Sequence, residues 1–264
     1  MEINVLYHPE KEEAKKTAKK ILEYLKKSNS ASLSPESHDL REIAIAIGGD
    51  GFAVRTAAHY SKLGIPTIAI NAGDVGFLTR GNVENWEDTL RLIVENRYVV
   101  EKRIGLNYLY NGHSSMNPIV NDVYFKHTLS VANFRVLING EETFSSLSAD
   151  GLIVSTPTGS TGYCSSADGP IVQPGMNCLI FTPICPYHLH TKPLVLLPET
   201  EITIEVLKAK RPGNLNLVAD GQIIGSMEEG ETVVIKKHTE NLLFAVIDHH
   251  DFYRALQEKK GLMK

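Results

Sequence analysis

The sequence lacks the features that mark secreted, membrane-spanning and nucleic-acid-binding chains. Its three cysteines form no C-x-x-C pair, so neither a disulfide framework nor a zinc knuckle is supported. No apolar run approaches the ~20 residues that a membrane-spanning helix needs, and the N-terminus resembles a strand followed by charges rather than a signal peptide. The net charge of −4 comes without a basic face, which argues against nucleic-acid binding. We therefore expect a cytoplasmic protein with no nucleic-acid and no membrane partner.

The remaining totals are those of an ordinary globular chain. It has 264 residues, of which 42% are hydrophobic and 22% are charged. This length suffices for one large domain or two small ones.

The first part of the chain alternates between two periodicities. Short apolar runs at 3–7, 43–47 and 67–71 predict buried strands. Helical spacing of apolar residues follows each run, over about 14–25, 52–63 and 83–94. Strands that alternate with helices indicate parallel pairing, so residues 1–97 are predicted to form a Rossmann-like α/β domain.

After about residue 98 the pattern becomes β-rich. Short β-branched runs are separated by turn residues, and Asn139-Gly140 is a strong hairpin signal. Only the segment 251–260 again predicts a helix.

The stretch GGDG at 48–51 joins a predicted strand to a predicted helix. Unpaired N–H groups and the helix dipole make such a junction an anion site, and glycine lets a phosphate approach the backbone. The stretch is neither a P-loop nor G-x-G-x-x-G. Asp50 is unexpected there, because a carboxylate repels phosphate. The alternative is a tight turn in which Asp50 only caps the helix.

A second stretch, SADGLIVSTPTGSTGYCSSADGP at 148–170, is rich in small hydroxyl residues and glycines. Pro157 disfavours regular helix or central-strand pairing in its middle. Many small donors beside exposed backbone suit a polyhydroxylated or phosphorylated ligand. The alternative is a polar loop in a β domain.

Five motifs together resemble those of the NAD kinase family, which uses ATP or inorganic polyphosphate. They are GGDG (48–51), NAGDVGFLT (71–79), VND (120–122), DGLIVSTPTGSTGY (150–163) and ADGQ (219–222). The resemblance implies an α/β N-terminal Rossmann-like domain over 1–97, with 248–264 packing back on it. It also implies a β-rich, β-sandwich-like C-terminal nucleotide-binding domain over 98–247, a homodimer or homotetramer, and a nucleotide between the domains.

The implied reaction transfers a phosphoryl group from ATP or polyphosphate to the 2′-hydroxyl of the adenosine ribose of NAD, which makes NADP. Mg²⁺ or another divalent metal would accompany the donor, and no protein metal ligands are predicted. By this resemblance Asp50 accepts the hydroxyl proton. The glycines Gly48, Gly49 and Gly51 would offer their amides to the donor phosphates.

The resemblance also places other residues at the substrate or donor. They are Arg55, Phe77, Asn121, Asp122, Ser148, Asp150, Thr158, Thr161, Gly162, Tyr163, Ser166 and Gln222. For three of these positions a second interpretation stays open: Arg55 as a solvated surface residue, Phe77 as a core residue, and Tyr163 as a structural hydrogen-bonding tyrosine.

The chain departs from the family pattern at a few positions. Phe52 follows GGDG where threonine is common, Ser148 stands where some members have arginine, and Asp168-Gly169 stands where many have two glycines before the proline. These changes concern the phosphate donor more than NAD recognition. Asp122 separately replaces a frequent glutamate in the pair that holds the nucleotide. Two alternatives therefore remain: a non-catalytic NAD-binding homologue, and a kinase of the same superfamily that acts on another small hydroxyl compound.

Overall fold

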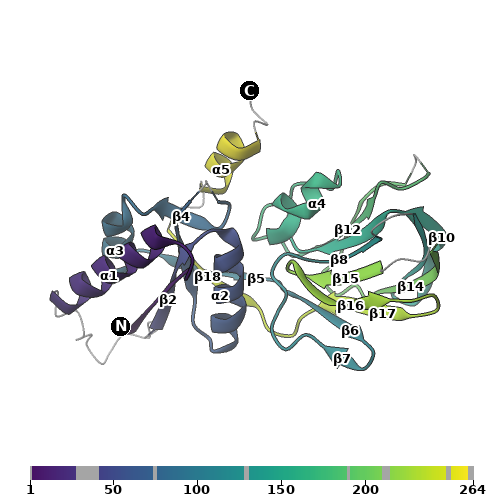
Figure 1. Cartoon of the computed structure of the whole chain (residues 1–264), viewed down its shortest axis with the longest axis horizontal. Coiled ribbons are helices and arrows are strands. Elements are labelled where there is room, and N and C mark those ends of the chain that lie inside the picture. Colours follow the sequence, from purple (N-terminus) through teal and green to yellow (C-terminus); the bar gives the residue numbers. More distant parts are fainter. Residues whose placement is uncertain are drawn as a thin grey trace. The chain divides into compact units, whose positions relative to one another are not determined.

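A computed structural model describes residues 2–27, 42–73, 76–127, 131–188, 191–209, 215–247 and 251–260. The chain divides into two compact units, one made of 1–102 with 242–264 and the other of 103–241 (Figure 1). The helix α5 (Asp251–Lys260) thus belongs to the first unit. No helix among these described residues is long and apolar enough to cross a membrane.

The first unit is a six-stranded sheet flanked by helices. The strand order is β1 (Glu2–Tyr7), β2 (Glu42–Gly48), β3 (Thr67–Asn71), β18 (Leu242–Val246) and β5 (Val99–Arg103), with β4 (Thr79–Asn82) paired to β3. The strands β1, β2 and β3 are parallel. This is the architecture that alternating strand and helix patterns predict.

The alternation within β2 decides which helices cover which face of this sheet. The isoleucines of β2 point to the face covered by α1 (Glu12–Lys27) and α3 (Trp86–Val94). Ala46 points the other way, where Ala53 of α2 (Asp50–Lys62) packs against it. Successive side chains of a strand alternate between faces, so the run Ile-Ala-Ile-Ala-Ile gives one broad apolar face and one shallow face. The shallow face lets α2 approach closely (Figure 1).

The second unit consists of two six-stranded sheets. The order in one sheet is β10 (Glu141–Ala149), β9 (Ala132–Ile138), β14 (Ile202–Ala209), β17 (Thr232–Lys237), β6 (Leu106–Tyr110) and β7 (His113–Ser114). The order in the other is β13 (Leu194–Leu196), β12 (Leu179–Ile184), β11 (Gly151–Ser155), β8 (Asp122–His127), β15 (Leu215–Ala219) and β16 (Gln222–Met227).

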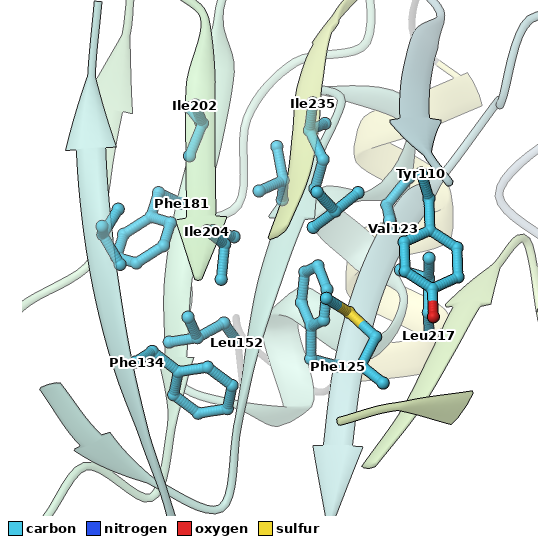
Figure 2. Packing of buried hydrophobic residues seen from close by; sticks show 14 of the residues in the cluster. Tyr110, Val123, Phe125, Phe134, Leu152, Phe181, Ile202, Ile204, Leu217 and Ile235 are labelled. Atoms are coloured by element: carbon cyan, nitrogen blue, oxygen red, sulfur yellow. The ribbon is translucent and has the colours of Figure 1, made fainter. Parts of the chain in front are cut away.

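Side chains from both sheets build one apolar core. Phe134 and Ile204 come from the first of these sheets, and Phe125, Leu152 and Phe181 come from the second (Figure 2). All five side chains are fully buried. The second unit is therefore a β-sandwich, and the predicted fold class of an α/β unit with a β-rich, sandwich-like unit is confirmed.

Two local predictions can be compared directly with the structure. The Asn139-Gly140 hairpin is confirmed: it joins β9 to β10, with φ of 52° and 83° at the turn residues. The predicted helix 52–63 is correct in kind but begins too late. Helix α2 starts at Asp50, because Gly49 already serves as its N-cap.

Candidate active site

The GGDG stretch lies where three parallel strands end together. Gly48 is the last residue of β2, Gly49 is the N-cap of α2, and Asp50 is its first helical residue. The chain after β1 donates from His8 N to Ile47 O at 2.9 Å, and the chain after β3 donates from Ala72 N to Gly48 O at 2.9 Å. Ligands of open α/β sheets bind at this carboxyl edge. We call residues 48–51 the glycine turn.

Asp50 is engaged by the chain that follows β3. Its Oδ2 accepts a hydrogen bond from Phe77 N at 2.8 Å, and its Oδ1 accepts one from Leu78 N at 3.2 Å. A Cβ on Gly76 would lie 2.1 Å from Asp50 Oδ1, so this approach requires a glycine there. These contacts hold the Asp50 side chain in a fixed orientation.

Two cations flank the glycine turn. The Arg55 guanidinium is exposed, and its Nη1 lies 3.9 Å from the position that a Cβ on Gly51 would take. On the other side, Lys11 Nζ lies 3.7 Å from the corresponding position on Gly49 and donates to Ala72 O at 2.9 Å. Sequence reasoning proposed Arg55 and missed Lys11. The signal for Lys11 was its place just after the first strand, which a parallel sheet brings beside the second.

Phe52 fills the space over the start of the turn. Its Cβ lies 2.9 Å from the position of a Cβ on Gly48, and its ring meets the His8 ring edge-on with centroids 5.6 Å apart. Gly48 therefore has a packing reason to be glycine. The N-cap Gly49 has no side-chain capping hydrogen bond, and Phe52 contributes packing next to it.

Phe77 is half-buried in the first unit. Its ring centroid lies 6.5 Å from that of Phe252 on α5, at an interplanar angle of 51°. Its backbone N–H is the group that holds Asp50. The residues Asp74 and Val75 of the NAGDVGFLT motif lie outside the described residues.

In the second unit, the segment before β8 meets the end of β11. Asp122 pairs with Ser155 in the sheet register, and Thr156 N donates to Asn121 O at 2.9 Å. Thr156 Oγ1 donates to Val120 O at 2.6 Å. A Cβ on Gly159 would lie 2.2 Å from Asn121 O, so the two segments touch through backbone. The structure thus brings together Asn121, Asp122 and the hydroxyl-rich loop.

Asp220, in the turn between β15 and β16, holds the segment before β8 by hydrogen bonds. The sequence motifs had not indicated this role. Its Oδ2 accepts from Val120 N at 2.8 Å and its Oδ1 accepts from Asn121 N at 2.7 Å, while Asp220 N donates to Asp122 O at 3.0 Å. Gln222 follows across the turn, exposed, as the first residue of β16. The signal for Asp220 in the sequence was its place in the ADGQ motif, two residues before Gln222. We call Asn121, Asp122, Thr156, Thr158 and Asp220 the strand-end cluster.

The electrostatics of this cluster are unusual. Asp122 is only 5% exposed, and its burial, followed by the negative charge of Asp220, raises the pKa of its carboxyl to about 7. Burial also raises the pKa of Asp220, although the N–H groups of Val120, Asn121 and Asp122 oppose that rise. Near neutral pH Asp122 can therefore either donate or accept a hydrogen bond.

Thr158 adds a buried hydroxyl to the cluster. It is 5% exposed, and its Oγ1 has no hydrogen-bond partner among the described residues. Buried polar atoms are almost always satisfied, so such a hydroxyl is suited to a ligand. It lies in the 3₁₀ helix η1 (Thr158–Thr161), and α4 (Tyr163–Ser166) follows. Thr161 is half-buried, while Gly162 and Ser166 are exposed.

Asp150 lies at the opposite end of β11 from this cluster. Its carbonyl accepts from His127 N at 3.0 Å, and five residue steps of strand separate it from Ser155, a span of about 17 Å. Tyr163 packs edge-on against Tyr124 in the middle of β8, with centroids 4.9 Å apart. Lys126 Nζ lies 5.6 Å from the Tyr163 ring centroid. Asp150, which precedes β11, and Thr158, which follows it, thus lie beyond opposite ends of this strand and are not neighbours in this chain.

Ser148 belongs to the other sheet of the sandwich. It lies on β10, and its hydroxyl donates to Asn133 Oδ1 at 2.5 Å across the β10–β9 pairing. The structure therefore uses its hydroxyl to join two strands and does not bring it to the strand-end cluster.

Sequence comparison covers both units. The ATP-NAD kinase N-terminal domain profile matches residues 3–98, and the ATP-NAD kinase C-terminal domain profile matches residues 120–246. The NAD kinase of Flavobacterium psychrophilum is 37% identical over 226 residues, which are 83% of this chain and 75% of that protein. The NAD kinase of Treponema denticola is 32% identical over 254 residues, 94% of this chain and 89% of that one.

Solved structures agree with these matches. An NAD kinase from Archaeoglobus fulgidus in complex with ATP is 28% identical, with a TM-score of 0.76 and 98% of each chain covered. A yeast NADH kinase complexed with NADH has a TM-score of 0.82 over 100% of this chain and 88% of that one. At 20% identity the yeast structure shows the shared fold alone. With both domain profiles matched and relatives above 30% identity along most of its length, the chain belongs to the NAD kinase family.

Proposed function

We propose that the chain catalyses phosphoryl transfer from ATP or polyphosphate to the 2′-hydroxyl of the adenosine ribose of NAD, with Asp50 as proton acceptor. NAD kinase activity follows from membership of the family. The observation that supports the further chemistry is the glycine turn, which holds one oriented carboxylate at the carboxyl edge of a parallel sheet.

The proposed role of Asp50 rests on its orientation. Two backbone N–H groups, from Phe77 and Leu78, fix the carboxylate. An ionised carboxylate within reach of the attacking hydroxyl can take its proton as the new P–O bond forms. Gly48, Gly49 and Gly51 leave the backbone open to the donor phosphates, which the start of α2 favours electrostatically.

NAD recognition is proposed for the second unit. Asn121, Asp122 and Thr158 would hydrogen-bond the ribose and base, with Thr161, Gly162, Tyr163 and Ser166 forming the adjoining surface. Asp122 suits this task because a carboxyl with a pKa of about 7 can donate as well as accept. Phe77, Asp150, Ser148 and Gln222 stay in the proposal on the strength of the motifs alone.

The divalent ion would come with the phosphate donor. Among the described residues, no three His, Cys, Asp or Glu side chains gather to hold a metal. Mg²⁺ commonly keeps several waters and binds through one or two carboxylates together with substrate phosphates. The phosphate oxygens of the donor, with water, would be its ligands here. When bound, the ion neutralises charge on the transferred group.

A coupled assay tests the proposal. Purified protein is incubated with NAD or NADH, Mg²⁺, and either ATP or polyphosphate, and NADP or NADPH is measured. Formation of NADP with at least one donor is expected. Calorimetric NAD binding without product from any donor would identify a non-catalytic NAD-binding homologue, and phosphorylation of a different hydroxyl compound would identify another kinase of the superfamily.

Two broader expectations also remain proposals. The homodimer or homotetramer rests on the family resemblance, and the cytoplasmic location rests on the cysteine usage of the sequence. Light scattering of the purified protein tests the first expectation, and a monomer would contradict it. Cell fractionation tests the second, and recovery of the protein outside the cytosolic fraction would contradict it.

A further inference from the structure

We propose that Lys11 binds the phosphate donor directly and places its ammonium charge on the transferred phosphoryl end of that donor. This inference rests on the proposed function, because it assigns a residue to the donor side of the same reaction. No motif of the sequence points to Lys11, and its role follows from where the fold puts it.

The fold carries Lys11 from the first strand to the glycine turn. The β1–β2 pairing ends at Tyr7 and Ile47, and the next residue, His8, still bonds to Ile47 O. Lys11 N donates to His8 O at 3.2 Å, which closes a tight turn before α1. The side chain of Lys11 is half-buried and reaches across to the chain after β3, where it bonds to Ala72 O at 2.9 Å.

The glycines on both sides leave room for this ammonium. A Cβ on Gly73 would lie 2.7 Å from Lys11 Nζ, and a Cβ on Gly49 would lie 3.7 Å from it. The absence of a side chain at Gly73 is therefore a condition for the position of Lys11. Nζ lies beside the backbone of the glycine turn, where the proposed function puts donor phosphates.

Among the described residues, the Lys11 ammonium has one hydrogen-bond partner. An ammonium carries three N–H donors, and one goes to Ala72 O. The other two can meet phosphate oxygens, which is the usual role of lysine toward phosphate as a point charge. Arg55 lies beside Gly51, so Lys11 and Arg55 would form a pair of cations on the two sides of the glycine turn. The glycine turn itself has one ionisable side chain, the carboxylate of Asp50.

The competing explanation is structural: Lys11 only ties the chain after β1 to the chain after β3. The two explanations differ in what they predict for substrates. A tether supports the whole first unit and affects thermal stability, whereas a phosphate ligand affects the donor alone. Charge-assisted hydrogen bonds contribute enough that their removal weakens binding about 10- to 100-fold.

The experiment compares Lys11→Ala, Lys11→Arg and Lys11→Gln with the unmodified chain. Binding of Mg²⁺–ATP and of tripolyphosphate is measured by isothermal titration calorimetry, and KM for donor and for NAD is measured in the coupled assay. Lys19→Ala, at an exposed lysine of α1, the helix that follows Lys11, is the matched control. We expect Lys11→Ala and Lys11→Gln to weaken both phosphate ligands about 10- to 100-fold, and Lys11→Arg to restore much of the loss.

In the Lys11 variants the KM for NAD should change less than 3-fold. Every value measured for Lys19→Ala should also change less than 3-fold. Unchanged donor affinity in folded Lys11→Ala or Lys11→Gln would overturn the proposal, as would an equal loss toward NAD and donor. Calorimetry keeps this inference separate from the proposed function. If the unmodified chain binds Mg²⁺–ATP but forms no NADP, the proposed reaction fails while the dependence of binding on Lys11 is still decided.

Discussion

The glycine turn and the strand-end cluster are built in opposite ways. The glycine turn is mostly backbone, and its charged groups are Asp50 and the long side chains of Lys11 and Arg55. The strand-end cluster is made of short side chains, of which Asp122, Thr156 and Thr158 are almost fully buried and Asn121 and Asp220 are half-buried. An open turn with cations suits a charged and exchangeable donor. A buried and prearranged set of hydrogen-bonding groups suits the selection of one nucleotide.

The comparison predicts that Asp50→Asn affects turnover and little else. We expect kcat to fall about 10²- to 10⁴-fold, because a positioned proton acceptor contributes that much. NAD affinity, measured by calorimetry, should stay within about 3-fold of that of the unmodified chain, because NAD recognition is proposed for the second unit. An undiminished kcat would remove Asp50 from the chemistry.

Gly159→Ala should break the strand-end cluster. The new Cβ would lie 2.2 Å from Asn121 O, so the backbone before β8 has to move. We expect a loss of about 1–3 kcal/mol in the free energy of unfolding, together with at least a tenfold loss of NAD affinity. Gly162→Ala provides a graded comparison, since its Cβ meets Gly159 O at 3.2 Å and needs only a small adjustment. Equal effects of the two changes would contradict this packing argument.

Asp220→Asn tests whether the cluster depends on a carboxylate. The amide oxygen can replace one acceptor, but the amide nitrogen would face the second backbone N–H, from either Val120 or Asn121. Leaving a buried donor unsatisfied costs about 1–3 kcal/mol, which urea unfolding can measure. We expect KM for NAD to rise and KM for the donor to stay constant. A variant as stable as the unmodified chain would show that Asp220 does not hold this segment.

The raised pKa of Asp122 predicts a distinct dependence of stability on pH. Its pKa rises from an ordinary value of 3.8 to about 7 on folding, so between these values the folded chain keeps a proton that the unfolded chain has lost. This carboxyl therefore contributes a decrease in stability as pH rises from about 4 to about 7, and no further change above that. Urea unfolding of Asp122→Asn should lack this decrease, and Asp88→Asn on the exposed side of α3 is the control. Parallel pH profiles for the unmodified chain and Asp122→Asn would refute the assignment.

Phe52→Thr should have the smallest effect. The change removes packing on Gly48 and His8 and restores a hydroxyl next to the glycine turn. We expect a loss of about 1–2 kcal/mol in stability, below the range for fully buried phenylalanines because Phe52 is half-buried. The donor KM should change less than 3-fold, as seen in the coupled assay. A tenfold improvement in donor KM would show that Phe52 limits the donor site.

The sequence was most informative where local patterns act alone. The strand 67–71 was predicted with the bounds that the structure has, because an apolar run bounded by Pro66 and a glycine-containing turn has few alternatives. The start of α2 was predicted two residues late, at 52. Glycine and aspartate are poor interior helix residues, and only the hydrogen bonds from Phe52 and Ala53 to Gly49 O show that the helix has already begun.

The residues of the candidate site also differ in whether local sequence indicates them. Motifs identified Asp50, Asn121 and Asp122, because their neighbours in sequence carry the signal. They could not identify Lys11 or the role of Asp220, since each acts on segments far away in the chain: Lys11 on Ala72, and Asp220 on Val120 and Asn121. Ser148 shows the opposite case, in which a motif position turns out to pair with Asn133 on the neighbouring strand.

The sequence by itself determined the alternation of strands and helices, the β-rich second half and the family, because periodicity and short motifs are local properties. The tertiary structure alone decided which charges meet. Parallel pairing of β1, β2 and β3 placed Lys11 beside Gly49, and the neighbouring strands β8 and β15 placed Asp220 against Asn121 and Asp122. Burial there raised the pKa of Asp122, an effect of desolvation that no stretch of sequence contains.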